Sequence, residues 1–289
     1  MRSGKFEVRR RNMKVTEFDA GSISYVTNRI ECAPTNLNSR HCHDTYEILY
    51  VSEGSGRYVV EGVEYPVKPR TLMIFPPLTF HCVTIDEGAV YDRTVLYFEE
   101  GGVADCAKGA FSKLSDMASP AGAFYSADAL PDAIISVFDR FEAIAQLPDL
   151  ERESLSILLL SELLIHLSLA HHEDWHYDEG ELGARVIRFL NNNMERDIPL
   201  DKLAKRFFVS KFYLCRAFKK YSGVSIHSYI NHKRVMYAKQ LIESGEAASA
   251  AAYRVGFGDY SAFYRAYVKI VGRAPTATDE RRENSDNEI

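Results

Sequence analysis

The spacing of hydrophobic positions changes along this chain from a strand-like pattern to a helical one. Between residues 15 and 100, short runs rich in Val, Ile, Tyr and Thr are separated by Gly, Pro and acidic turns. Many short strands at this spacing are typical of a sandwich or barrel. The clearest strands are predicted at residues 46–51, 57–60, 71–75, 81–85 and 93–98.

Residues 130–172 predict an antiparallel pair of helices, interrupted at Pro148-Asp149. The first helix has one apolar stripe, formed by Ile134, Val137, Phe138, Phe141, Ile144 and Ala145. Leucines continue along the second helix at Leu155, Leu158, Leu159, Leu163 and Leu167. The pair has surplus apolar surface, which could pack on the β region or form a dimer interface, and both uses remain open. The polar stretch 171–176 is typical of a connector.

The last hundred residues predict a series of short helices. We expect them at residues 182–194, 200–207, 211–221, 226–243, 247–255 and 260–271. Ser210 and Asp259 are in N-cap position, and Gly223 and Gly272 follow the last turn of their helices. A short helix, a tight turn and a second helix therefore occur twice. This is the helix-turn-helix arrangement, whose second helix enters the major groove of DNA.

The two second helices repeat one short segment at a distance of 49 positions. Residues 214–218 recur as residues 263–267, and Lys220 and Gly223 recur as Lys269 and Gly272. Repetition of this kind indicates a duplicated supersecondary unit. With residues 226–243 as a helix between them, the two second helices would enter successive major grooves, about 34 Å apart.

The exposed faces of these helices carry the residue types that contact DNA. Arginine can bind guanine O6 and N7 together, and aromatic or apolar groups can contact a thymine methyl group. The expected base-reading residues are Phe212, Cys215 and Arg216 in the first copy, and Ser261, Tyr264 and Arg265 in the second. The expected phosphate contacts are Lys211, Lys219, Lys220 and Lys269. A lone arginine would more often form a surface ion pair, but two matched copies favour DNA recognition.

Charge and composition agree with this division. Residues 1–180 have a net charge of −12, whereas residues 181–282 have +10. A basic block joined to an acidic one is typical of a nucleic-acid-binding domain attached to another module. No apolar run is long enough to span a bilayer, and the basic N-terminus lacks the apolar region of a signal peptide. The five cysteines (Cys32, Cys42, Cys82, Cys106 and Cys215) are expected to be reduced thiols in a cytoplasmic protein.

The C-terminal motifs resemble the DNA-binding domain of the AraC/XylS family of bacterial transcription regulators. The likeness covers residues 184–276. It rests on Ser210-x3-Leu214-x-Arg216-x-Phe218, on the helix with Tyr229-Ile230 and Arg234, and on Gly256-Phe257-x-Asp259-x-Ser261-x-Phe263-x-Arg265. The chain departs from the family pattern in the alanine-rich stretch 247–252, in residues 267–269 and at Thr278-Asp279. We therefore expect weaker packing in the second motif and a dominant role of the first in affinity.

The N-terminal histidines resemble another motif. His41-x-His43-x3-Glu47-x6-Gly54 is similar to the first motif of the cupin barrel, and Pro76 and His81 to part of the second. His41, His43, Glu47 and His81 could hold a divalent metal such as Zn, Fe, Mn or Ni. They could instead line a ligand pocket or be structural. We expect the pocket to include Tyr46, Tyr58, Phe75 and Phe80, which would suit a small polar ligand such as a sugar.

These observations favour an α+β multidomain protein that is not an enzyme. We expect a cupin-like β-barrel at 15–105, a helical linker and dimerisation region at 106–178, and a double helix-turn-helix domain at 180–282. The resemblance implies a homodimeric activator that binds promoter DNA, a small effector and RNA polymerase, and that requires no cofactor. A metal-dependent cupin enzyme fused to a DNA-binding module, or a regulator that needs no ligand, are the alternatives.

Overall fold

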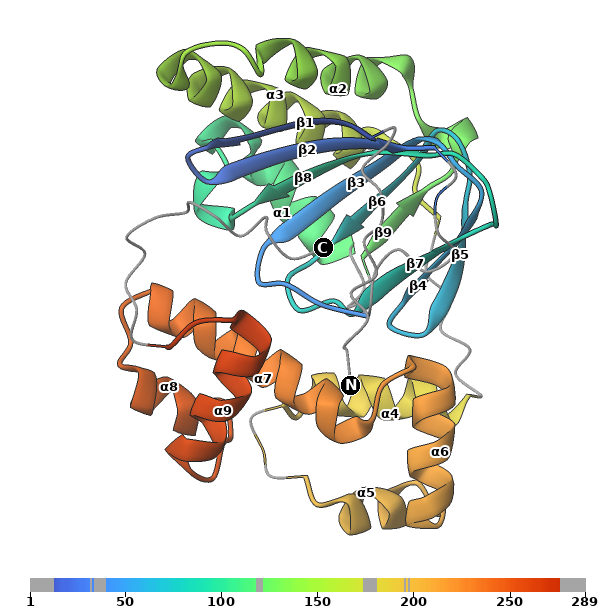
Figure 1. The fold of residues 1–289 in the computed structure, drawn as a ribbon, viewed down its shortest axis with the longest axis vertical. Helices are drawn as coiled ribbons and strands as arrows, with labels where there is room; N and C mark the ends of the chain where they lie inside the picture. The colour runs from blue at the N-terminus through green and yellow to red at the C-terminus, as the bar shows by residue number, and fades with distance from the viewer. Residues whose placement is uncertain are drawn as a thin grey trace, which may run out of the picture. The chain divides into compact units, whose positions relative to one another are not determined.

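A computed structural model describes residues 13–31, 33, 40–117, 122–173, 181–194, 196 and 198–275 of the 289-residue chain. The chain divides into two compact units. The first comprises residues 1–41 and 45–177, and the second comprises residues 178–289 together with the short segment 42–44. The first unit is rich in β structure and the second is helical (Figure 1). Three features named above lie outside the described residues: Cys32, connector positions 174–176 and Thr278-Asp279.

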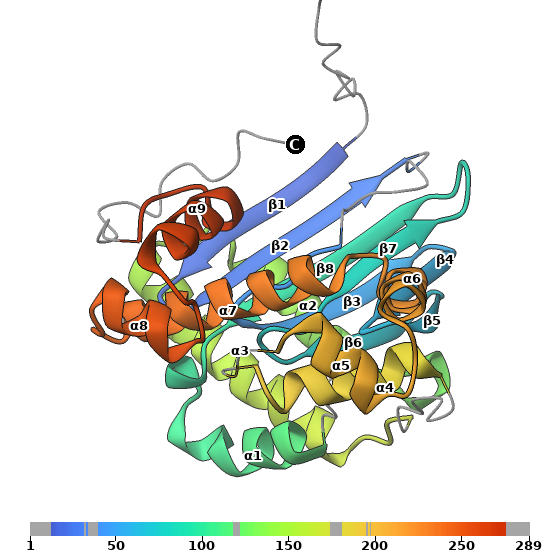
Figure 2. The ribbon, with the colours of Figure 1, turned by 90° about the horizontal axis from the view of Figure 1, so that it is seen from below.

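Two antiparallel sheets form the β part of the first unit. The larger sheet has the order β1-β2-β8-β3-β6-β9 (Figure 2), and the smaller has the order β5-β4-β7. The strands are β1 Met13–Ala20, β2 Ile23–Ile30, β3 Tyr46–Glu53, β4 Gly56–Val60, β5 Val63–Val67, β6 Thr71–Phe75, β7 His81–Ile85, β8 Tyr91–Phe98 and β9 Ala123–Tyr125. All five expected strands are present. Within the described residues no named strand belongs to both sheets, so the expected β-rich N-terminal domain consists of two sheets that are not closed into one.

Three helices cover the outer face of the larger sheet (Figure 1). They are α1 Lys108–Met117, α2 Asp132–Ile144 and α3 Asp149–Leu169. Alternation along β3 directs Ile48 toward these helices and Leu49 toward the second sheet, so the strand contributes to two cores. The apolar stripe of α2 is buried against the sheet. Packing on the β region therefore accounts for that stripe, whereas Leu150 and Leu158 on α3 stay 74% and 62% exposed.

The described part of the second unit is helical. Its helices are α4 Leu182–Asn191, α5 Leu200–Arg206, α6 Lys211–Ser222, α7 Ile226–Glu243, α8 Ala248–Arg254 and α9 Tyr260–Val271. α7 and α9 have the expected bounds, since Ser225 and Asp259 accept hydrogen bonds from backbone N–H groups of their first turns. α4 approaches α6 closely at Gly183, where a Cβ would lie 2.3 Å from the Tyr221 Cβ. None of the helices in the described residues is long and apolar enough to cross a membrane.

Candidate DNA interface and effector site

The second helices of the two motifs, α6 and α9, have the same local construction. Ser210 Oγ accepts a hydrogen bond from the Tyr213 N–H at 3.2 Å, and Asp259 Oδ1 accepts one from the Ala262 N–H at 2.7 Å. Each helix ends at a glycine in the left-handed region, Gly223 with φ 76° and Gly272 with φ 80°. A left-handed residue at this position ends a helix, and glycine adopts it without a steric penalty. The sequence repeat is thus also a structural repeat.

Burial divides each of these helices into a core face and an exposed face. Leu214 and Phe218 are buried in α6, as are their counterparts Phe263 and Tyr267 in α9. Every expected base-reading residue lies outside the buried set: Phe212, Arg216, Ser261, Tyr264 and Arg265 are exposed, and Cys215 is half-buried. Phe212 is 77% exposed, an unusual position for a large apolar ring unless a partner covers it.

The basic residues on these helices are available to different degrees. Lys219, Lys220 and Lys269 are exposed. Lys211 instead donates to Asp201 Oδ2 at 3.1 Å, which ties the start of α6 to α5. No carboxylate among the described residues pairs with Arg216 or Arg265 within ion-pair distance. The surface ion pair that would explain a lone arginine is therefore not found here.

The two motifs differ in the first helix and in the turn. In backbone hydrogen bonding, Leu203 and Ala204 of α5 correspond to Ala251 and Ala252 of α8. All four side chains are buried, so a leucine that supports the first motif has an alanine as its counterpart. Ala251 follows Leu203 by 48 residues, whereas Asp259 follows Ser210 by 49. The turn of the second motif is therefore one residue longer than that of the first. The expected weaker packing of the second motif has this physical basis.

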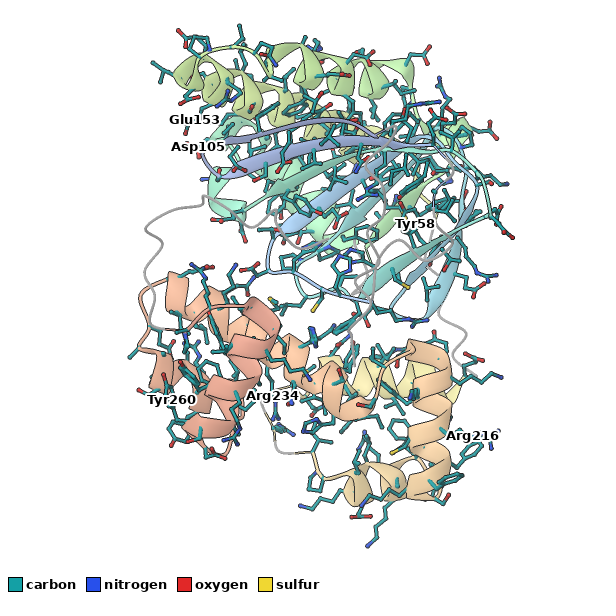
Figure 3. The ribbon with its side chains drawn as sticks, in the orientation of Figure 1. Tyr58, Asp105, Glu153, Arg216, Arg234 and Tyr260 are labelled. Carbon is teal, nitrogen blue, oxygen red and sulfur yellow. The ribbon has the colours of Figure 1, made fainter. Side chains whose placement is uncertain are left out.

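Arg234 of α7 joins the segment that follows α4, a helix packed on α6, to the turn of the second motif. Its guanidinium donates to the Met194 carbonyl at 3.0 Å and the Arg196 carbonyl at 2.6 Å, both after α4, and to the Gly256 carbonyl in the turn of the second motif at 2.8 Å. The side chain is only 9% exposed (Figure 3). A planar donor with a fixed fork can satisfy three carbonyls at once. The resemblance includes Arg234, but only the structure shows what it binds.

Three exposed aromatic residues beside the motifs were not predicted. Phe208 is 93% exposed, Tyr213 56% and Tyr253 60%. Phe208 also has a φ of 56° in the turn before α6, in the left-handed region that non-glycine residues rarely adopt. Sequence periodicity could have placed Tyr213 outside the core stripe, but the burial of a turn residue depends on the packing of neighbouring helices.

The N-terminal motif brings together three of its four candidate ligands. His43, Glu47 and His81 each offer a ligand atom, and these atoms lie within 4.8 Å of one another. Glu47 and His81 are buried, and His43 is half-buried. His41 is not part of this set. It forms an isolated antiparallel bridge with His81, and their rings are 4.5 Å apart.

Hydrogen bonding fixes the orientation of the His81 ring. Nδ1 lies 2.9 Å from the Thr79 carbonyl oxygen, which can only accept, so Nδ1 carries the proton. Nε2 then faces Glu47 Oε2 at 3.3 Å. This arrangement suits a hydrogen bond between the two side chains or a cation held by both. A backbone carbonyl on the far nitrogen is also the usual arrangement behind a histidine metal ligand.

A polar face continues from Glu47 across the space between the sheets. Glu47 is paired in register with Tyr97, and Asn28 with Arg93, while Arg93 lies 5.2 Å from the centre of the Tyr91 ring. Burial raises the pKa of Tyr91 and of Tyr97; Glu47 raises both further, and Arg93 opposes the increase. Oδ1 of Asn28 is buried without a hydrogen-bond partner among the described residues. Alternation along 91–97 could have placed these β8 residues on one face.

The remaining expected pocket residues lie in two different places. Tyr58 is buried between the sheets (Figure 3), and its hydroxyl is hydrogen-bonded to that of Tyr91. Phe75 stacks on His81 with ring centres 4.5 Å apart, and Phe80 is buried just before it. Tyr46 is separated from this group: it precedes Glu47 on the strand, points to the opposite face and stacks on Phe98.

Comparison with known proteins gives matches to both halves of the chain. Residues 25–168 match the AraC-like ligand binding domain, and residues 203–281 match a helix-turn-helix domain. The chain is an AraC-family transcriptional regulator. Its ligand-binding domain precedes its helix-turn-helix DNA-binding domain.

Relatives of this AraC-family regulator align over most of its length. The HTH-type transcriptional regulator YbfI of Bacillus subtilis is 27% identical over 76% of the chain and 79% of the relative. The HTH-type transcriptional activator RhaS of Mannheimia succiniciproducens is 23% identical over 84% and 90%, respectively. Among solved structures, ToxT of Vibrio cholerae aligns with 89% of the chain and 95% of its own at 13% identity and a TM-score of 0.41. The relatives' names describe regulators, not enzymes.

Proposed function

We propose that this regulator binds two neighbouring major grooves through α6 and α9 and changes transcription in response to a small polar effector. The observation that carries the proposal is the matched pair of helices, each with an arginine exposed opposite a buried apolar face. Arg216 and Arg265 would bind guanine, with Phe212, Cys215, Ser261 and Tyr264 beside them, and Lys219, Lys220 and Lys269 would contact phosphates. Lys211 would join these phosphate contacts by releasing Asp201.

Footprinting of the regulator on its own upstream region tests this assignment. We expect two protected segments about one helical turn apart, one of which disappears with Arg216→Ala and the other with Arg265→Ala. Inserting five base pairs between the segments would turn one half-site to the opposite side of the duplex and should abolish joint protection. A single protected segment that is unaffected by either substitution would contradict the proposal.

The effector would bind at the polar face between the sheets. Glu47, Tyr97 and Arg93, with His43 and His81 nearby, combine donors and acceptors with aromatic surface, which suits a hydroxyl-rich molecule such as a sugar. A melting-shift screen of sugars should give a stabilising ligand whose effect is lost in Arg93→Gln. Tyr46→Phe on the opposite face is the matched control. The ligand must also alter operator binding or transcription, because it can act only through different affinities for two states.

A divalent metal at His43, Glu47 and His81 is the second candidate for this site. The donor set fits Zn or a similar ion, and Nδ1 of His81 is held by a carbonyl in the manner of a metal ligand. A bound metal would polarise a ligand oxygen. Elemental analysis of the purified protein should show one equivalent that is lost in His43→Ala. If no stoichiometric metal is present, the proton shared by Glu47 and His81 explains the pair.

The exposed leucines of α3 would form a dimer interface within the helical region 106–178. Leu150, Leu158 and Leu169 are 74%, 62% and 76% exposed and follow one another at eight and eleven residues, which places them along one side of the helix. Sedimentation should show a dimer that Leu158→Glu weakens by at least tenfold. An unchanged assembly state would remove α3 from the interface.

Activation through RNA polymerase is the expected outcome of promoter binding. The support for an activator is that two relatives, RhaS of Mannheimia succiniciproducens and RhaR of an Enterobacter species, are named HTH-type transcriptional activators. Transcription from the footprinted promoter can be measured in a purified system with and without the stabilising ligand. The amount of transcript decides whether the regulator activates or represses. Less transcript in the presence of the bound regulator would make it a repressor.

A further inference from the structure

A hollow in the second unit is lined by residues outside both α6 and α9. It is a half-open groove of about 710 Å³ between α4 and α5, and Asn192, Asn193, Arg196, Ile198 and Pro199 complete its lining. Its size falls within the range of small-molecule sites. Both α4 and α5 pack on α6, and the groove is the space left between their other sides.

Positive charge dominates the lining of this groove. Five of its residues are cations: Arg185, Arg188, Arg196, Lys202 and Arg206. No acidic side chain lines it within the described residues. Glu195 and Asp197, which flank Arg196 in the sequence, lie outside the described residues, and counting both would still leave an excess of three positive charges. Cations gathered in a concave site repel one another, so an anion that enters is attracted by all of them.

Two of the arginines are held in place by aromatic rings. The guanidinium carbon of Arg206 lies 4.4 Å from the centre of the Phe189 ring, and that of Arg185 lies 5.4 Å from the centre of the Phe207 ring. The two rings pack edge to face at 6.1 Å. A guanidinium stacked on a ring keeps its N–H edge available for bidentate bonds to phosphate oxygens. Arg185, Lys202 and Arg206 have no ion-pair partner among the described carboxylates.

The groove does not share the DNA-reading face of α6. Arg216 points away from α4 and α5 (Figure 3), whereas Lys202 and Arg206 line the space between those two helices. The one carboxylate of α5, Asp201, is paired with Lys211 at the start of α6. DNA bound along α6 would therefore leave the groove open to a second ligand.

We propose that this groove is an anion site in the DNA-binding domain that takes a small metabolite carrying two or more phosphate groups. Two stacked guanidinium groups and the Lys202 ammonium supply planar and point-charge donors for the phosphates. Asn192 and Asn193 add amide groups for the rest of the molecule. The site is separate from the effector site between the sheets and does not depend on that assignment.

Calorimetric titration of the full chain with tripolyphosphate and with ATP, free of magnesium and at constant ionic strength, tests the proposal. The wild type should bind one equivalent of at least one probe. Lys202→Glu should weaken this binding at least tenfold, and Lys205→Glu should change it less than twofold. Lys205 lies on the same helix but outside the groove, so Lys205→Glu makes the same change in charge as Lys202→Glu without changing the lining of the groove. Arg206→Lys, which keeps the charge but loses the fork, should weaken binding in a correctly folded protein.

Several results would overturn the proposal. The first is that the wild type shows no saturable binding of either probe. The second is that Lys202→Glu and Lys205→Glu weaken probe binding equally, which would indicate general charge attraction. A large loss of probe binding in Arg216→Gln would place the phosphates on the DNA-reading face. The groove would instead be a contact to the DNA backbone if a DNA duplex displaced the probe and if Lys202→Glu lowered the affinity for that duplex more than Lys205→Glu did.

Discussion

Replacing Arg234 should loosen the connection between the two helix-turn-helix motifs. Its guanidinium bonds to three carbonyls from two separate segments, and it is 9% exposed. A hydrogen bond from a charged donor contributes about 1.5–3 kcal/mol. The three share one side chain and are not additive, so we expect Arg234→Met to lower the free energy of unfolding by about 3–5 kcal/mol. That is a large part of the total stability of an ordinary domain.

Two further variants separate the contribution of hydrogen-bond geometry from that of charge. Arg234→Lys keeps the positive charge, but one ammonium cannot reach all three carbonyls, so we expect about half of the loss. Arg254→Gln removes an arginine from a partly exposed pair with Glu246 and should cost no more than about 1 kcal/mol. Urea unfolding followed by circular dichroism gives the stability, and hydrogen exchange identifies the helices that open.

DNA binding provides a second measurement on the same variants. A looser connection should weaken binding to an operator with both half-sites, because part of the binding free energy is then used to align the two motifs. Binding to an isolated first half-site should change much less. An unchanged unfolding midpoint and an unchanged ratio of the two affinities in Arg234→Met would refute the reasoning.

Three other predictions concern the motifs and the helix pair. Arg216→Ala should weaken operator binding by about 1–3 kcal/mol in a gel-shift titration, and Arg265→Ala by less; the reverse order would contradict the unequal support of the motifs. Phe208→Gly should raise the melting temperature of the helical unit, because glycine relieves a left-handed backbone at a gain of up to about 1 kcal/mol. A hydrogen bond from Arg140 at 2.5 Å holds the pKa of Glu162 below its usual range. This pair stabilises the folded state by at most about 1 kcal/mol above the pKa that Glu162 has in the unfolded chain, and the stabilisation is lost as the pH falls through the lower folded pKa. The difference in the free energy of unfolding between wild type and Glu162→Gln should therefore disappear in acid.

Local signals explain which parts of the fold could be predicted from the sequence. Helices 226–243 and 260–271 have the predicted bounds because a capping side chain marks each start. The short helix at 108–117 was not predicted individually, and its sequence contains a glycine at position 109 and few apolar residues. Strand β9 has only three residues and exists through its pairing with β6, some fifty positions earlier. Pairing at that distance leaves no periodic pattern in the segment itself.

The candidate sites show the same limit. The spacing of Glu47 and the histidines predicted a cluster, but His41 lies before the strand begins, so strand alternation does not align it with Glu47. Tyr46 was expected in the pocket, but in a strand it must face the opposite side from Glu47. In the helical unit, the cations of α4 and α5 have spacings typical of solvated faces. Only the packing of both helices on α6 makes them the two walls of one groove.

The two copies of the repeated motif share an exposed arginine but differ in their support. Arg216 and Arg265 occupy matching exposed positions, but the buried leucine at 203 corresponds to alanine at 251. The missing methylene groups reduce the burial energy of α8 relative to α5 by about 2 kcal/mol. Ligand-dependent coupling between sites is typically 1–3 kcal/mol, which is of the same size. A ligand whose affinity for two states differs by this amount could therefore shift the second motif, whereas the first, with its leucine and its ion pair from Lys211 to α5, is better suited to hold the operator throughout.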